Sequence, residues 1–159
     1  MKAGQEMLSE AERDRIRGSL GTSGGKAAIS DALMAIQESR GWVSDEAIGE
    51  VAEALGVGCA EVEGVATFFE LVFRRKVGRH VILLCDSVSC WVMGYEQVVQ
   101  QLYDRLNIGL GETTADGRFT LLPVVCLGAC DRAPAVMIDN DLHGELDTKK
   151  IDEVLAGYK

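Results

Sequence analysis

In the first half of the chain, apolar residues recur every three or four positions, which is the period of an amphipathic helix. Ser9 followed by Glu12 resembles a capping box, so a helix is expected to begin near residue 10. Gly41 and Gly56 stand where left-handed helix caps are expected. The short connections predict a small helical bundle. Its predicted helices cover residues 10–20, 26–40, 45–55 and 60–73.

From residue 79 onward the pattern changes to short, continuous apolar runs, which are typical of buried strands. Pro123, near the end of one run, favours an edge strand. The order of elements predicts a mixed α/β (α+β) architecture, with a helical domain over residues 1–77 and a mixed-sheet domain over residues 78–159. The predicted strands cover residues 80–84, 119–124, 135–138 and 142–146, with helices over 93–106 and after a cap at Asp147 or Thr148.

Four cysteines in two short pairs follow two of these predicted strands. Cys85 and Cys90 come after the first strand, and Cys126 and Cys130 come after the second. Four residues separate the first pair, three separate the second, and thirty-five lie between the pairs. Two strands that end side by side would bring four thiolates to one place. The sequence therefore predicts a metal centre held by these four cysteines.

Iron–sulfur, zinc and disulfide chemistry compete for these cysteines. The chain begins with a polar stretch over residues 1–6, so we expect a reducing compartment, where structural disulfides are rare. Five cysteines also leave one unpaired. Structural zinc sites accept spacings of about two to four residues, although neither pair forms the tight two-residue knuckle that favours zinc. The spacing favours an iron–sulfur cluster and leaves a structural zinc site open.

The residues around the pairs suit a 2Fe–2S centre on chemical grounds. Such a centre with four thiolates is anionic, and it needs backbone N–H groups aimed at sulfur and protection from water. Gly128 can take positive φ and bring the backbone close, although an ordinary turn glycine would look the same. We expect apolar cover from Val88, Trp91, Leu127 and Ala129.

Composition and charge narrow the class of protein. The 159-residue chain has a net charge of −9, which disfavours nucleic acid, whose binders normally present a basic surface. No segment approaches the ~18 apolar residues of a transmembrane helix, so a partner would have to hold the chain at a membrane. No glycine-rich strand-to-helix turn is present, so we expect dinucleotide and flavin to bind elsewhere. Cys59 is interpreted as a partly buried bystander thiol, and His80 and His143 as structural or surface residues.

The segments that carry the cysteines resemble a known family. Residues 85–90 (CDSVSC), 116–123 and 126–131 (CLGACD), with 40–43 and 63–69 upstream, look like the small thioredoxin-like ferredoxin subunit of bacterial NADH–quinone oxidoreductase, respiratory complex I. The resemblance extends from about residue 25 to the last residue. It implies a thioredoxin-like fold with one 2Fe–2S cluster held by Cys85, Cys90, Cys126 and Cys130.

The resemblance also implies a role and partners. The chain would carry single electrons to and from the FMN of a partner subunit that oxidises NADH, and it would have no complete active site of its own. The helical part would help to dock this partner, and the large iron–sulfur subunit would be a second neighbour. The location would be cytoplasmic, peripheral on the inner membrane through partner subunits.

Two alternatives stay open at this point. One is the equivalent subunit of an NAD-linked hydrogenase or formate dehydrogenase, which use similar flavin-bearing partners. The other is a zinc-stabilised interaction module without a redox role.

Overall fold

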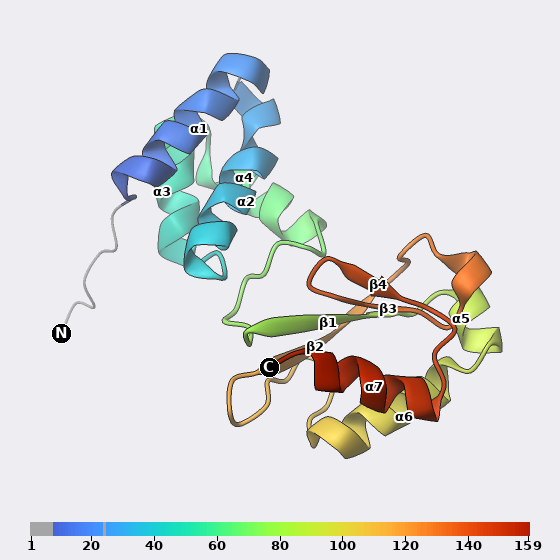
Figure 1. Ribbon diagram of the computed structural model, residues 1–159. Coiled ribbons are helices and arrows are strands. Elements are labelled where there is room, and N and C mark those ends of the chain that lie inside the picture. The colour runs from blue at the N-terminus through green and yellow to red at the C-terminus, as the bar shows by residue number, and fades with distance from the viewer. Residues whose placement is uncertain (1–7, 24) are drawn as a thin grey trace. The chain divides into compact units, whose positions relative to one another are not determined.

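The computed structural model describes residues 8–23 and 25–159, and this part of the chain forms two compact units (Figure 1). The helical unit ends at Lys76, and the sheet unit begins at Val77. The predicted α/β (α+β) class, with helices first and a mixed sheet second, is confirmed. That each unit folds as an independent domain stays a prediction. The polar stretch over residues 1–6, on which the predicted compartment rests, lies outside the described residues.

The helical unit buries the apolar stripes that the sequence predicts. Leu33, Ile36, Val51 and Val62 are fully buried in one common core. The predicted left-handed caps after α2 and α3 are confirmed, with φ of 82° at Gly41 and 65° at Gly56. The described elements are α1 (Glu10–Ser23), η1 (Gly25–Ala28), α2 (Ile29–Arg40), α3 (Asp45–Leu55) and α4 (Cys59–Phe68).

The predicted extent of the last helix in this unit is wrong. The apolar stripe predicts a helix to residue 73, but α4 ends at Phe68 and Phe69 takes an extended backbone with φ −87° and ψ 115°. The chain then turns, so that the Phe73 N–H donates to Gln37 Oε1 at 2.6 Å and the Phe73 carbonyl accepts from the Val43 N–H at 2.8 Å. Tertiary hydrogen bonds replace those that a longer helix would have made.

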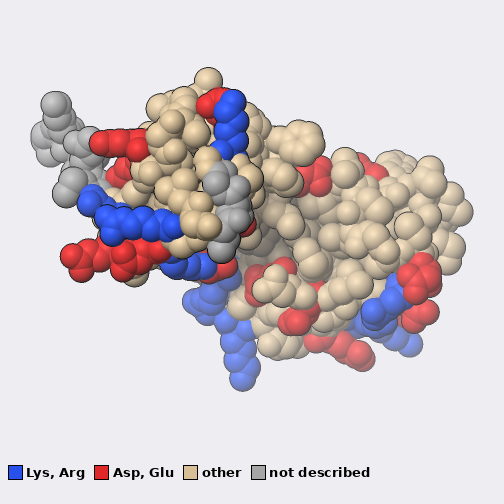
Figure 2. All heavy atoms as spheres, turned by 90° about the horizontal axis from the view of Figure 1, so that it is seen from above, with Lys and Arg blue, Asp and Glu red and all other residues tan. Residues whose placement is uncertain are grey.

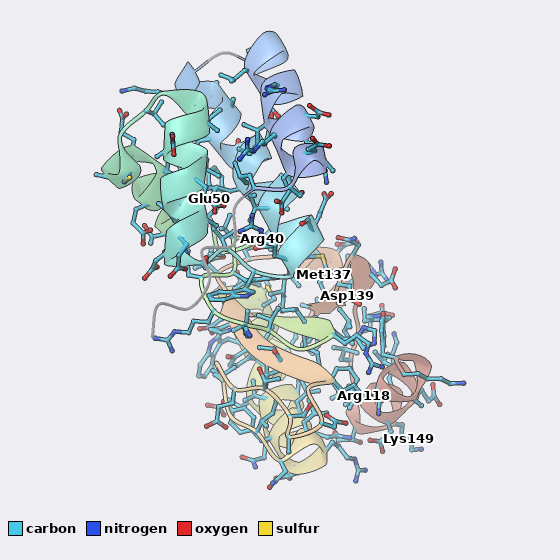
Figure 3. The ribbon with its side chains drawn as sticks, turned by 90° about the vertical axis from the view of Figure 1, so that its left-hand side faces the viewer. Arg40, Glu50, Arg118, Met137, Asp139 and Lys149 are labelled. Carbon is cyan, nitrogen blue, oxygen red and sulfur yellow. The ribbon has the colours of Figure 1, made fainter. Side chains whose placement is uncertain are left out.

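A buried ion pair ties α1 to α2. The predicted capping box is confirmed, because the Ser9 N–H donates to Glu12 Oε2 at 2.8 Å and the Glu12 N–H donates to Ser9 Oγ at 3.2 Å. The same Glu12 carboxylate also accepts two hydrogen bonds from the Arg40 guanidinium, both at 2.9 Å. Arg40 reaches Glu50 of α3 at 3.2 Å as well, and Figure 3 labels both residues. One guanidinium therefore connects three helices.

The sheet unit contains one mixed sheet of strand order β2-β1-β3-β4. β1 and β2 are parallel, whereas β3 is antiparallel to both β1 and β4. Helices α6 and α7 lie side by side along one side of this sheet (Figure 1). The elements are β1 (His80–Cys85), α5 (Val88–Val92), α6 (Tyr95–Leu106), β2 (Phe119–Val124), η2 (Cys130–Arg132), β3 (Val136–Ile138), β4 (Asp141–His143) and α7 (Thr148–Gly157).

Most of the predicted elements of the sheet unit are confirmed, and two differ. β2 is an edge strand, as Pro123 indicates. Sequence reasoning missed the short helix α5, which Gly94, with φ of 109°, separates from the longer helix α6. β4 ends at His143, three residues earlier than predicted, because the next residues bond to the loop before β3 instead of to the sheet.

Two surface properties bear on the class of protein. None of the described helices combines the length and the apolar character that crossing a bilayer requires. Blue and red side chains lie close to one another in several places on the face that Figure 2 shows. Such mixing of signs is typical of charge that maintains solubility.

Candidate metal centre

The parallel pairing of β1 and β2 decides where the two cysteine pairs meet. Cys85 ends β1 directly opposite Val124, the last residue of β2, and Cys126 follows two residues later. The Asp86 N–H donates to the Val124 carbonyl at 2.8 Å, so the two chains stay together beyond the strand ends. Because both strands point the same way, both cysteine loops leave the sheet at one edge. The prediction that the two strands end side by side is confirmed.

The remaining two cysteines reach the same edge from α5 and η2. Cys90 lies in α5 and is buried. Cys130 begins η2, which precedes β3, and β3 starts at this edge because it is antiparallel to β1. The Cys85 N–H donates to the Ala135 carbonyl at 3.3 Å, which fastens the start of β3 to the end of β1. Figure 1 shows α5 beside the loop that contains η2.

The four thiols interact with one another across the two pairs. The Cys90 thiol interacts with those of Cys85 and Cys130, and the Cys126 thiol interacts with those of Cys130 and Cys85. Cys85 and Cys90 are buried, whereas Cys126 and Cys130 are exposed. Among residues 8–23 and 25–159, no three His, Cys, Asp or Glu side chains are arranged to hold a single metal ion. A 2Fe–2S cluster needs a different set, since four thiolates serve two irons.

Burial and backbone hydrogen bonds act in opposite directions on these thiols. Burial raises the pKa of the Cys90 thiol to about 11, and the neighbouring Cys85 thiol adds to this, whereas the Ala135 N–H opposes it. The pKa of Cys126 is lowered, first by the Gly128 N–H, which donates to Cys126 Sγ at 3.3 Å. Metals bind the thiolate form, so loading the centre at neutral pH would release protons.

The donor set and its surroundings fit a 2Fe–2S cluster. The Gly128 N–H donates to the Cys126 sulfur, and in the other pair the Ala135 N–H interacts with the Cys90 thiol. Gly128 takes φ of 73°, as its position in the loop predicts. Sequence reasoning missed Ala135, because its contribution comes from the backbone and leaves no signal in the residue type.

The predicted apolar cover is only partly present within the chain. Ala129 is buried and Leu127 is half-buried. The Trp91 indole N–H donates to the Asp86 carboxylate, and its ring stacks on Tyr95 with centroids 5.3 Å apart. The apolar side chains of α5 and its next residue nevertheless face solvent, with Val88 78 %, Trp91 49 %, Val92 81 % and Met93 60 % exposed.

Cys59 belongs to the helical unit, and both histidines make hydrogen bonds with residues other than the four cysteines. Cys59 is exposed at the start of α4, in the helical unit. His80 begins β1, at the opposite end of the strand from Cys85, and its Nδ1 lies 2.8 Å from Asp139. His143 Nε2 lies 2.8 Å from the Tyr158 hydroxyl. The positions of the two histidines agree with the prediction that they are structural or surface residues, whereas Cys59 is exposed and not partly buried as predicted.

The fold and the four thiols define a class of protein. The sequence profile described as thioredoxin-like [2Fe-2S] ferredoxin matches residues 19–159, and the chain belongs to this family. The family resemblance drawn from residues 85–90 and 126–131 is thereby confirmed.

Individual proteins narrow the comparison further. The chain is 50 % identical over 153 residues to the E subunit of NADH-quinone oxidoreductase from Pseudomonas aeruginosa, covering 96 % of this chain and 92 % of that protein. It is 49 % identical to the same kind of subunit from Escherichia coli K12, with the same coverage. Both relatives are components of an oxidoreductase and match over nearly their whole length.

Solved structures of a second kind of enzyme are also similar. A chain of the NAD+-reducing [NiFe]-hydrogenase in the air-oxidized state matches 94 % of this chain with a TM-score of 0.67 and 25 % identity. The H2-reduced state matches 78 % with a TM-score of 0.66 and 27 % identity. This chain spans only 24 % and 21 % of those hydrogenase chains.

Proposed function

We propose that this chain is the electron-carrying subunit of an NADH–quinone oxidoreductase and holds one 2Fe–2S cluster on Cys85, Cys90, Cys126 and Cys130. The meeting of two cysteine pairs at one edge of the sheet carries the proposal. Identity of 50 % to an NADH-quinone oxidoreductase subunit of nearly the same length supports it. When bound, the cluster supplies reversible uptake of single electrons.

The protein's own residues hold the thiolates and set their surroundings. Gly128 and Ala135 direct backbone N–H groups at sulfur, which stabilises negative charge there. The Ser87 hydroxyl also interacts with the Cys126 thiol and helps to lower its pKa. Burial of Cys85 and Cys90 keeps water from the inner half of the centre, so the exposed half, at Cys126 and Cys130, is the side open to a partner.

The exposed apolar rim formed by Val88, Val92, Met93 and Val125 is the surface that we assign to the flavin-bearing partner. Electron transfer slows steeply with distance, so the partner must approach the edge of the sheet that carries the cysteines. A rim of apolar side chains is typical of a surface that a partner covers. FMN and NADH would bind to that partner, with the large iron–sulfur subunit as a second neighbour. The assembly would hold the chain on the cytoplasmic side of the inner membrane.

Metal analysis tests the proposed cluster directly. Protein purified without oxygen should be coloured and contain about two irons and two acid-labile sulfides per chain. Reduction should produce the EPR signal of a one-electron-reduced 2Fe–2S centre. A colourless chain with one zinc and no sulfide would support the zinc-stabilised interaction module instead.

The similarity to the hydrogenase chains supports one further candidate, the equivalent subunit of an NAD-linked hydrogenase. The cluster and the flavin-bearing partner would be of the same kind, so the chain alone does not distinguish the two. Isolation of the native assembly does, because quinone reductase subunits or a nickel–iron subunit would accompany the chain.

A charge placed on the apolar rim should weaken partner binding. Val92→Asp puts a carboxylate where the partner would exclude water, and we expect at least about a tenfold weaker complex with the flavin-bearing subunit, or ~1.4 kcal/mol. The matched control is Asn140→Asp, which adds the same charge at the turn between β3 and β4, at the other end of the sheet. Both variants should keep the cluster. Equal affinity of the Val92 variant and the control, measured by titration, would show that the rim is not the docking surface.

A further inference from the structure

A short strap, residues 144–146, holds the segment that carries Cys130 in place. The strap links β4 to α7 and packs against the loop before β3. The Glu145 N–H donates to the Arg132 carbonyl at 2.6 Å, and the Leu146 N–H donates to the Pro134 carbonyl at 3.2 Å. Gly144 and Leu146 are both buried.

Gly144 leaves no room for a side chain. An added Cβ would lie 2.5 Å from Arg132 Cβ and 2.6 Å from the Arg132 carbonyl oxygen. Neither atom is the end of a flexible side chain, so the Arg132 backbone itself would have to move. Gly144 is not in the left-handed region, so the requirement for glycine here comes from close approach and not from φ.

A displaced Arg132 would disturb the centre at two points. Arg132 is two residues from Cys130, and its N–H closes the turn around that cysteine by donating to the Ala129 carbonyl at 3.0 Å. Three residues further on, the Ala135 carbonyl accepts from the Cys85 N–H at 3.3 Å, and the Ala135 N–H interacts with the Cys90 thiol. The segment from 130 to 135 therefore supplies one ligand and orients two others.

The strap is itself anchored to α7. The Lys150 ammonium donates to the Gly144 carbonyl at 2.6 Å. The Asp147 carboxylate caps the helix by accepting from the N–H groups of Lys149 and Lys150, at 2.9 Å and 2.8 Å. Helix α7 thus holds the strap in place, and the strap in turn packs closely against Arg132.

We infer that Gly144 and Lys150 are positioning residues for the 2Fe–2S cluster, acting through Arg132 and Ala135. This inference rests on the proposed function, because it assigns to these residues an effect on the bound cluster. Contacts around metal ligands orient them and set their electronic properties, and their loss weakens metal binding about 10- to 100-fold.

The test compares clusters in otherwise similar variants. Gly144→Ala should lose iron to a chelator about tenfold faster than the wild type and should shift both the EPR g values and the midpoint potential. When both proteins are free of cluster, hydrogen exchange at the Ala135 amide should be faster in Gly144→Ala than in the wild type. Lys150→Met keeps the aliphatic stem, so it should change these readouts in the same direction as Gly144→Ala but to a smaller extent. If Gly144→Ala does not fold, Lys150→Met tests the positioning role.

Two control variants separate positioning from general destabilisation. In Gly157→Ala, the added Cβ would have none of the surrounding atoms within 4 Å. In Gly78→Ala, the added Cβ would lie 3.0 Å from the Arg118 backbone. Gly78 precedes the start of β1, at the opposite end of that strand from Cys85. Gly78→Ala should lower the thermal stability and leave the EPR signal, the potential and the iron release of the wild type unchanged.

The possible outcomes distinguish the two proposals. If the wild type holds the cluster and Gly144→Ala and Lys150→Met match it in EPR, potential and iron release, only the positioning role is overturned. The same holds if Gly78→Ala changes these readouts as much as Gly144→Ala does. A wild type that binds no cluster overturns the proposed function, and with it this inference.

Discussion

Cys126→Ser is expected to lose the cluster, whereas Cys59→Ser is expected to keep it. Cys126 is one of the four proposed ligands, and a serine hydroxyl is far less acidic than a thiol and a poor ligand for iron in a sulfur site. Since changes next to metal ligands already cost about 10- to 100-fold in affinity, loss of a ligand should cost more than a hundredfold. Iron, sulfide and visible absorbance per chain measure the result.

Cys59→Ser is the matched control for this experiment. Cys59 is an exposed thiol like Cys126, so neither exchange opens a cavity in the core. The unfolding free energy of the chain without cluster should therefore be close to that of the wild type in both variants, and only cluster content should differ. The reverse pattern, with the cluster lost from the Cys59 variant and kept in the Cys126 variant, would show that the ligands are wrongly assigned.

Arg40→Met should destabilise the helical unit by about 3 kcal/mol. Its guanidinium holds the buried carboxylate of Glu12, which is 4 % exposed. Methionine fills similar space without charge, so in this variant the Glu12 carboxylate stays buried and loses its Arg40 partner. Urea unfolding followed by circular dichroism measures the loss. In the control Arg15→Met, the broken pair with Glu38 is half exposed, and the expected change is at most about 0.5 kcal/mol.

The same pair makes the stability depend on acid. Arg40, with smaller contributions from hydrogen bonds to Ser39 and Ser9, lowers the pKa of Glu12 from 4.5 to about 2, against the opposing effect of burial. A carboxylate with a depressed pKa in the folded state stabilises fully above 4.5, and this contribution is lost as pH falls from 4.5 toward 2. The shift corresponds to roughly 3 kcal/mol at neutral pH. Urea titrations between these pH values should show that the unfolding free energy falls more steeply with decreasing pH in the wild type than in Arg40→Met. Parallel pH dependences would contradict the role of Arg40 in lowering the pKa of Glu12.

The sequence predicts features that depend on neighbouring residues. Ser9 and Glu12 form the capping box that their spacing indicates, and glycines at 41 and 56 end their helices in the left-handed conformation. The period of the apolar residues is enough to find the buried faces, since each helix must bury its stripe. The same local pattern cannot show that Glu12 also receives Arg40, which lies 28 residues later.

For the candidate centre, the sequence by itself determined the four cysteines, their spacing and the strands that precede them, because these are properties of residue type and order. Only the tertiary structure decided that β1 and β2 are parallel neighbours and that α5 carries Cys90. It also decided that Ala135 and the strap at Gly144 hold the loop that bears Cys130. These contacts come from backbone N–H and C=O groups and from close approach between segments far apart in the chain. Such interactions depend on distance in space, which the order of residues does not state.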